Sequence, residues 1–122
     1  MEGMSANVER SVFTKIIARE IPADIVFEND RVIAFRDIHP QAPVHLLVVP
    51  KTQQYQNVTE LAAADPTLLA EVVATAKRLA TEHSNGEYRL IFNEGASTGQ
   101  TVFYVHAHVL SGELAEGTLA RQ

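Results

Sequence analysis

Short apolar runs along the chain predict five strands. Residues 24–28 and 31–36 are joined by an Asn-Asp pair, which suits the tight turn of a hairpin. Residues 44–49 are almost wholly apolar and lie between two prolines, which indicates a central strand buried on both faces. Residues 88–92 predict a fourth strand. Residues 102–109, rich in β-branched and aromatic side chains, predict the fifth.

Helical spacing of apolar positions occurs in two longer segments. It covers residues 8–19 and a stretch that starts at Asp65-Pro66 and ends near His83. Asp is favoured just before a helix and Pro at its first position, so the second segment has a clear start. Residues 57–61 predict a single helical turn. The order of elements predicts an α+β fold, with an antiparallel sheet of about five strands and two helices.

Composition limits the partners of the protein. A chain of 122 residues is long enough for one domain with a single core. The formal net charge of −5 argues against binding of nucleic acid or an anionic membrane. No apolar run reaches membrane-spanning length, and the first residues lack the features of a signal peptide. The absence of cysteine excludes disulfides and agrees with the cytoplasmic location that we expect.

The expected last strand carries two histidines two residues apart. Side chains alternate along a strand, so His106 and His108 share one face with Tyr104. Such a pair is often only a polar surface facing water, and two imidazoles on one face can also bind zinc. His45 lies inside the apolar central strand, where it is either a core histidine or a third member of a site. The pattern alone leaves these interpretations open.

The loop before the histidines is small and polar. Gly95 and Gly99 lie in residues 94–100, so backbone amides there can approach an anion without a Cβ in the way. The Lys and the spacing of a Walker loop are missing. The loop is either a plain polar turn or, beside His106, a phosphate-binding loop.

The segment Val-His-Ala-His-Val-Leu at residues 105–110 resembles the signature of the histidine-triad (HIT) family of nucleotide hydrolases and transferases, with Tyr104 at the first histidine position. Other stretches resemble the nucleoside phosphoramidase branch of that family, namely residues 13–17, 20–23, 35–38, 40–51 and 93–95. The resemblance implies a HIT-like nucleotide-binding domain over residues 11–110. Residues 1–10 are then an N-terminal extension, and residues 111–122 a C-terminal tail.

The resemblance also implies a role for each candidate residue. His106 would attack the α-phosphorus of a nucleotide, a cationic His108 would neutralise phosphoryl oxygens, and His45 would lie beside the leaving group. Asp37 would bind the ribose, although a turn residue before Pro40 is the other interpretation. Phosphate or leaving-group contacts are implied for Asn93, Gln100 and Thr101, and base-pocket contacts for Phe13, Ile16, Ile21 and Ile38. We assign His39 and His83 to solvent.

The implied substrate is a purine nucleoside 5′-phosphoramidate or a related adenylate, and the implied assembly is a homodimer. Two alternatives remain open, cleavage of dinucleoside polyphosphates and a nucleotide- or partner-binding role with little turnover. A metal site formed by the three histidines is a further interpretation. Some family members bind a structural zinc at the positions that are Ser11, Thr14, Gln53 and Tyr104 here. Because no cysteine or histidine occupies them, we predict that the protein needs no metal and no cofactor.

Overall fold

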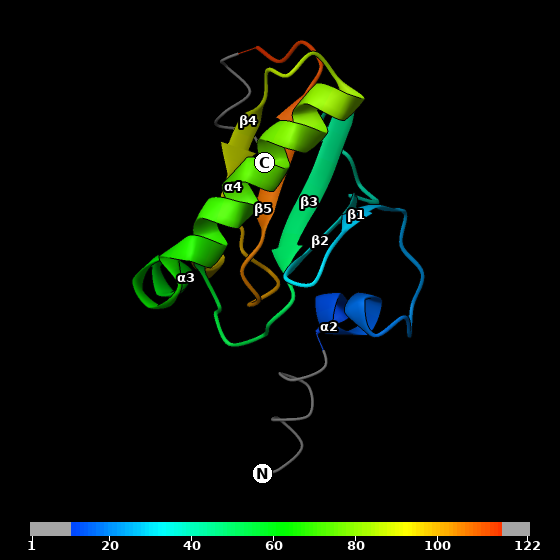
Figure 1. Cartoon of the computed structure of the whole chain (residues 1–122). Coiled ribbons are helices and arrows are strands. Elements are labelled where there is room, and N and C mark those ends of the chain that lie inside the picture. Colours follow the sequence, from blue (N-terminus) through cyan, green and yellow to red (C-terminus); the bar gives the residue numbers. More distant parts are fainter. Residues whose placement is uncertain (1–10, 116–122) are drawn as a thin grey trace.

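The computed structural model describes residues 11–115, so residues 1–10 and most of the expected tail lie outside the described residues. The described part contains five strands, three α-helices and a short 3-10 helix (Figure 1). The strands are β1 (Ile25–Glu28), β2 (Val32–Arg36), β3 (Val44–Pro50), β4 (Arg89–Ile91) and β5 (Ala107–Ser111). The helices are α2 (Val12–Ile17), α3 (Val58–Ala64), α4 (Pro66–His83) and the 3-10 helix η1 (Ala96–Thr98). No helix among the described residues is long and apolar enough to cross a membrane.

The five strands form one antiparallel sheet in the order β1-β2-β3-β5-β4. This confirms the α+β fold class. The central position of β3 explains its apolar sequence, since all of its residues after Val44 are buried. Strand β3 pairs with β5 so that His45 lies opposite Leu110 and Leu47 opposite His108. The pairing joins segments that are about sixty residues apart in the chain.

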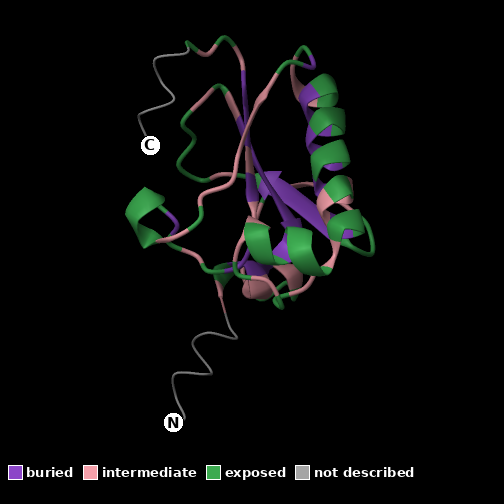
Figure 2. Ribbon diagram, turned by 90° about the vertical axis from the view of Figure 1, so that its left-hand side faces the viewer, coloured by how far each residue is buried: buried purple, intermediate pink, exposed green. Residues whose placement is uncertain are grey.

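A helix layer covers one face of the sheet. Figure 2 shows α4 with buried residues toward the sheet and exposed residues toward solvent. Alternation along each strand sends one set of side chains under α3 and α4 and the other set toward α2. The larger core comprises Val32, Ala34, Leu46, Val48, Leu61, Leu68, Val72, Ala76, Leu79, Val105, Ala107 and Val109. The smaller core comprises Phe13, Ile16, Ile33, Phe35, Leu47, Val49 and Tyr104.

Local sequence signals account for the helix ends. Asp65 caps α4 by accepting from the Leu68 N–H group, and Pro66 is its first residue, as expected. The single turn expected after residue 57 is instead the seven-residue helix α3, capped by the Asn57 side chain. The protein therefore has three described α-helices rather than two. The first expected helix lies partly outside the described residues and ends at Ile17.

The last strand is shorter than the pattern predicts, because β5 starts only at Ala107. The register would place Val105 opposite Pro50, which has no N–H group to continue the ladder. The Val105 N–H group instead donates to the Tyr55 carbonyl. Side chains before β5 still alternate between the two faces of the sheet, because Tyr104 lies in the smaller core and Val105 in the larger core. Alternation predicts Phe103 on the apolar face with Val105, but its side chain is 51% exposed.

Candidate active site

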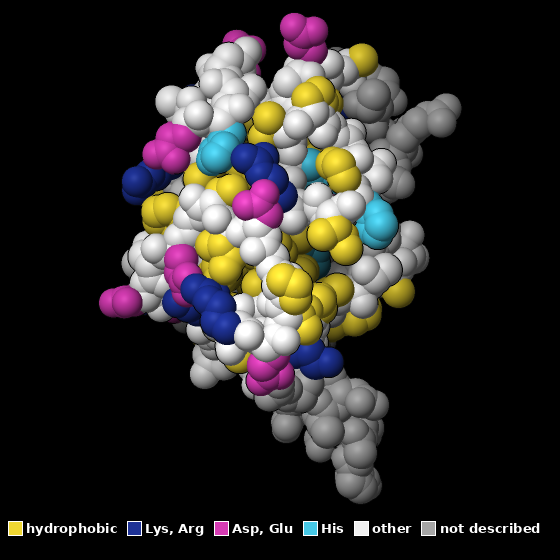
Figure 3. All heavy atoms as spheres, turned by 90° about the vertical axis from the view of Figure 1, so that its right-hand side faces the viewer, with side chains coloured by type: hydrophobic (Ala, Val, Ile, Leu, Met, Phe, Trp, Pro, Cys, Tyr) yellow, Lys and Arg dark blue, Asp and Glu magenta, His cyan; other side chains and the backbone are white. Residues whose placement is uncertain are grey.

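The pairing of β3 with β5 brings the three candidate histidines together on the face opposite α4. His45 Nε2 lies 3.0 Å from His108 Nδ1. The ring centroids of His106 and His108 are 5.1 Å apart. Figure 3 shows histidine side chains set among hydrophobic ones on one face of the molecule. A set of residues separated by some sixty positions in the chain is thus one cluster in the fold.

The histidines line a cavity of about 440 Å³. Six of the candidate residues lie around it, namely His45, His106, His108, Asp37, Asn93 and Thr101. Seven further residues complete the lining, namely His39, Gln41, Arg89, Ile91, Gly99, Leu110 and Leu114. The volume falls within the range of small-molecule sites, and its polar groups come from both strands and loops.

The ring of His106 is held in one tautomer. Its Nδ1 atom lies 2.7 Å from the Tyr104 carbonyl oxygen, which can only accept, so Nδ1 carries the proton. The Phe13 ring packs edge-on against the imidazole at a centroid distance of 4.9 Å. Burial lowers the pKa of His106 below its usual value, although the bond to the Tyr104 carbonyl and the Asp37 charge oppose this. His106 therefore has a neutral ring with its lone pair on Nε2.

The tautomers of His45 and His108 follow from a backbone contact. The Gln41 N–H group donates to His45 Nδ1 at 3.0 Å, so a neutral His45 carries its proton on Nε2. That proton faces His108 Nδ1 at 3.0 Å and Asp37 Oδ2 at 3.4 Å. A neutral His108 that accepts at Nδ1 carries its own proton on Nε2. The pair thus presents a hydrogen-bond donor on His108 without needing a second positive charge.

The pKa shift is larger for His108 than for the other two histidines. Burial first, and then the neighbouring His106 and His45 rings, lower the pKa of His108 to about 4, while Asp37 opposes the shift. Burial likewise lowers the pKa of His45. The cationic His108 that we expected from the sequence is therefore a neutral donor in the ligand-free protein at neutral pH.

The buried histidines predict a pH-dependent stability. Between the unfolded pKa of about 6.5 and the folded pKa of about 4, the unfolded chain binds a proton that folded His108 does not. The free energy of unfolding should therefore fall as the pH falls through this window. The shifted pKa of His108 accounts for on the order of 2 kcal/mol of this fall, once the shift is discounted for solvent screening. Urea titrations of wild type and His108→Gln at pH 7 and pH 4 measure this change in the free energy of unfolding. The same decrease from pH 7 to pH 4 in both proteins would contradict the prediction.

Three side chains at the cavity could supply ligands to a metal ion. Asp37, His45 and His108 have ligand atoms within 4.8 Å of one another. A metal-bound histidine usually donates a hydrogen bond with its other ring nitrogen, whereas His45 Nδ1 accepts one from the Gln41 N–H group. Coordination through His45 Nε2 would then require an anionic ring. This tautomer disfavours a metal site, and the absence of a metal requirement stays a prediction that the zinc content of pure protein can test.

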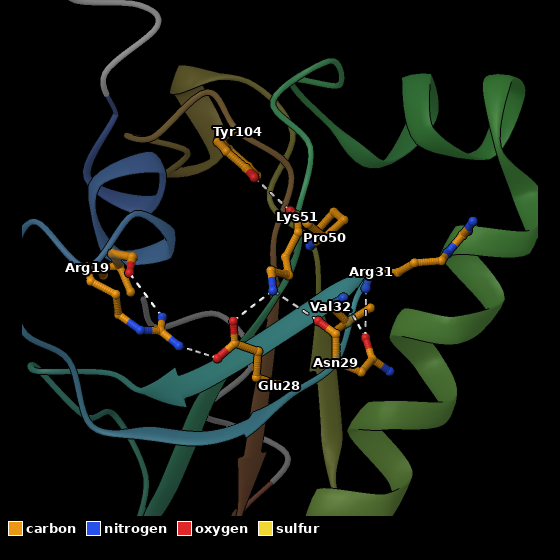
Figure 4. A network of polar contacts seen from close by, with 9 residues as sticks. Arg19, Glu28, Asn29, Arg31, Val32, Pro50, Lys51 and Tyr104 are labelled. Atoms are coloured by element: carbon orange, nitrogen blue, oxygen red, sulfur yellow. Dashed lines mark hydrogen bonds and ion pairs between the residues drawn. The ribbon is translucent and has the colours of Figure 1, made fainter.

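The four positions that hold zinc ligands in some family members form hydrogen bonds in this protein. Ser11 Oγ lies 3.1 Å from Thr14 Oγ1, and Thr14 Oγ1 donates to Gln53 Oε1 at 3.0 Å. The Tyr104 hydroxyl points at the end of β3 and donates to the Pro50 carbonyl at 2.7 Å (Figure 4). Burial raises the pKa of Tyr104 to about 12, so the hydroxyl stays protonated. These polar contacts tie α2 to the segment after β3, and the segment before β5 to the end of β3.

Removing the Tyr104 hydroxyl should destabilise the protein. In Tyr104→Phe the Pro50 carbonyl loses its donor in a buried environment, and we expect a loss of about 1 to 2 kcal/mol in the free energy of unfolding. Urea denaturation followed by circular dichroism measures the loss. An unchanged midpoint would show that water replaces the hydroxyl.

Two other polar candidates have contacts that suggest different roles. Asp37 Oδ1 accepts from the His39 N–H group at 2.8 Å, while its Oδ2 faces His45, so the carboxylate both shapes a turn and lines the cavity. Gln100 is only 4% exposed and is absent from the cavity lining. Its Oε1 accepts from the Gly95 N–H group at 2.8 Å, and its Nε2 donates to the Gln56 and Val102 carbonyls. Gln100 thus holds the glycine loop in place.

The loop geometry explains its glycines. Gly95 and Gly99 have φ angles of 98° and 101°, in the region that other residues rarely adopt. Gly99 and Thr101 line the cavity, while the Gly95 N–H group is used by Gln100. Only the later part of the expected phosphate-binding loop therefore faces the histidines.

The four apolar candidates lie outside the cavity lining. Phe13 and Ile16 are buried in the smaller core, with Phe13 touching His106. Ile21 lines a separate hollow of about 380 Å³ beside α2, and Ile16 contributes to the same hollow. Ile38 is 84% exposed. A base-binding role for these residues stays a prediction.

Three polar lining residues were not predicted from the sequence. His39 is exposed as expected, yet it lines the cavity together with Gln41. Arg89 reaches the same cavity from edge strand β4. Alternation along β4 places Arg89 and Ile91 on one face, but only the pairing with β5 makes that face the one with His108.

Comparison with known proteins identifies the class of protein. The family model of the HIT domain matches residues 18–114, so the chain belongs to the HIT family. The chain is 49% identical over 105 residues to an uncharacterised HIT-like protein of Synechococcus elongatus, covering 85% of this chain and 91% of that protein. It is 42% identical over 106 residues to the purine nucleoside phosphoramidase of Escherichia coli K12, covering 85% of this chain and 88% of that protein.

A solved structure agrees with the family assignment. The HIT family hydrolase of Clostridium thermocellum matches with a TM-score of 0.81 and 42% identity, covering 88% of this chain and 94% of that chain. Homologues in this family support hydrolase activity in general terms.

Proposed function

We propose that the protein hydrolyses purine nucleoside 5′-phosphoramidates or related adenylates to the nucleoside monophosphate, through a covalent nucleotidyl-histidine on His106. One observation carries this proposal. The His106 ring is neutral, its Nδ1 proton is held by the Tyr104 carbonyl, and it lines the cavity that also holds the His45–His108 pair. A neutral imidazole with a fixed tautomer is what nucleophilic attack on phosphorus requires.

In the first step, His106 Nε2 forms a bond to the α-phosphorus while the bond from phosphorus to the leaving nitrogen breaks. The leaving nitrogen takes up a proton from solvent water and departs as ammonia or an amine. The ring becomes cationic as this bond forms, and the Tyr104 carbonyl stabilises it through the Nδ1 proton. The neutral His108, with its proton on Nε2, would donate to the phosphoryl oxygens. In the second step, water attacks phosphorus and loses a proton to solvent, while the bond from phosphorus to His106 Nε2 breaks. This releases the monophosphate and restores the neutral His106.

Other lining residues support nucleotide binding in this proposal. Asp37 presents a carboxylate oxygen that can accept from ribose hydroxyls, while its other oxygen is fixed by the His39 N–H group. Asn93 and Thr101 offer polar groups at the same cavity. The similarity to the purine nucleoside phosphoramidase of Escherichia coli supports this substrate class.

The experiment is AMP release from adenosine 5′-phosphoramidate in the presence of EDTA. We expect steady turnover, since no step uses a metal ion. If the wild-type protein releases no AMP while calorimetry shows that AMP binds, the hydrolase proposal fails and a binding role replaces it. Parallel reactions with a dinucleoside polyphosphate compare the two hydrolytic alternatives directly.

We also propose that the protein is a homodimer that works in the cytoplasm. Strand β4 is at the edge of the sheet in the described part of the chain, so its outer side is available to extend the sheet. The absence of cysteine is compatible with a reducing compartment. Light scattering after gel filtration measures the mass, and a monomer at micromolar concentration would contradict the first proposal.

A further inference from the structure

Asp37 faces the histidine cluster from the loop between β2 and β3. Its Oδ2 atom lies 3.4 Å from His45 Nε2, and its Oδ1 atom accepts from the His39 N–H group at 2.8 Å. The second contact fixes the carboxylate, because its donor belongs to the backbone. The Asp37 side chain is only 19% exposed, and it lines the same cavity as His106 and His108. The protein itself therefore holds a carboxylate at the edge of the cluster.

Asp37 is the only acidic residue that lines this cavity within residues 11–115. Its negative charge raises the pKa of His45, His106 and His108, although burial lowers all three more strongly. A carboxylate that favours the protonated form of an imidazole also favours a positive charge that arises on the ring in another way. The formation of a covalent bond at a ring nitrogen is one such way.

We propose that Asp37 has a second role besides ribose binding, in which its carboxylate stabilises the positive charge that forms on His106 when Nε2 bonds to phosphorus. The inference rests on the proposed function, because it assumes the nucleotidyl-histidine step. That step leaves the Nδ1 proton in place beside the Tyr104 carbonyl, so the ring is cationic until water releases the nucleotide. Burial penalises this charge, and the Tyr104 carbonyl is a neutral acceptor. A carboxylate supplies the missing opposite charge.

The two roles of Asp37 predict different kinetic changes. The unreacted His106 ring is neutral, so it gains little from the Asp37 charge in the substrate complex. The attraction grows as the bond to phosphorus forms, and an interaction that appears only toward the transition state raises kcat. Hydrogen bonds to the ribose hydroxyls are already present in the bound substrate, so their loss mainly raises KM.

The test uses a substrate without ribose hydroxyls, the 2′,3′-dideoxy analogue of adenosine 5′-phosphoramidate. Asp37→Asn keeps an oxygen for the His39 N–H group but removes the charge, whereas Asp37→Glu keeps the charge. We expect Asp37→Asn to lower kcat for the dideoxy substrate about 10- to 50-fold, and Asp37→Glu to lower it less. The matched control is Asp24→Asn, since Asp24 is exposed, pairs with Arg36 and lies outside the cavity lining. It makes the same change in net charge and should leave kcat unchanged.

Urea denaturation gives the folded fraction of each variant, and kcat is expressed per folded molecule. An unchanged kcat for the dideoxy substrate in Asp37→Asn would overturn the inference and leave Asp37 as a ribose contact. Equal losses in Asp37→Asn and Asp37→Glu would also overturn it, because the charge would not be the cause. A wild-type protein that cleaves the ribose substrate but not the dideoxy substrate would count against it too, since the hydroxyls would then carry the rate. Failure of the wild-type protein to cleave the ribose substrate would instead overturn the proposed function.

Discussion

Replacing His106 with Asn should lower kcat/KM for adenosine 5′-phosphoramidate by about 10⁴-fold or more. Asn keeps a polar side chain of similar reach but has no ring nitrogen to form the bond to phosphorus. The other two histidines cannot substitute, because His45 Nδ1 is occupied by the Gln41 N–H group and His108 Nδ1 by His45. Initial rates of AMP release in EDTA measure the effect.

A matched control separates chemistry from stability. His83→Asn makes the same substitution near the end of α4, outside the cavity lining, and should turn over like wild type. Mass spectrometry of wild type quenched during turnover should find a nucleotidyl adduct on the peptide with His106. Retention of more than a tenth of the activity in His106→Asn would exclude His106 as the essential nucleophile.

Gln100→Ala should have the second-largest effect, and on stability as well as on turnover. The substitution leaves the Gly95 N–H group and the Gln56 and Val102 carbonyls without their partner. We expect the free energy of unfolding to fall by about 2 to 4 kcal/mol. Turnover should fall about 10- to 100-fold, because the loop positions that line the cavity are no longer held.

This prediction separates two roles for Gln100. A side chain that only contacted the nucleotide would leave the stability of the ligand-free protein unchanged when removed. Urea denaturation without ligand, together with kcat and KM, therefore distinguishes the two roles. Gln54→Ala, at an exposed position, is the control and should change neither quantity. A normal stability for Gln100→Ala would return Gln100 to the group of direct nucleotide contacts.

Much of the fold was predictable because local patterns carry it. The apolar run of β3, the Asp-Pro start of α4 and the hairpin of β1 and β2 each depend on neighbouring residues only. The errors occurred where a distant residue decides the outcome. Strand β5 begins late because its would-be partner is Pro50. Helix α3 continues past a single turn to Ala64, and its Leu61 is buried in the larger core.

The candidate site also has features that local sequence predicts and features that depend on distant residues. The sequence pattern and the family resemblance select residues 45, 106 and 108, and the structure places them around one cavity. No sequence pattern indicates that Gln100 is buried behind the loop or that the base-pocket candidate Ile38 is largely exposed. Such facts depend on which segments meet in three dimensions.

The sequence by itself determined the class of this protein, since its strands, its main helix and its histidine motif are local features that residue types and their spacing specify. Only the tertiary structure decided the chemical state of the site. The protons on His106, His45 and His108 depend on the Tyr104 carbonyl and the Gln41 amide, whose positions follow from the folded chain. The position of Arg89 at the cavity likewise depends on the pairing of β4 with β5, which places this residue on the histidine face. Strand pairing joins residues far apart in sequence, so no local pattern can specify it.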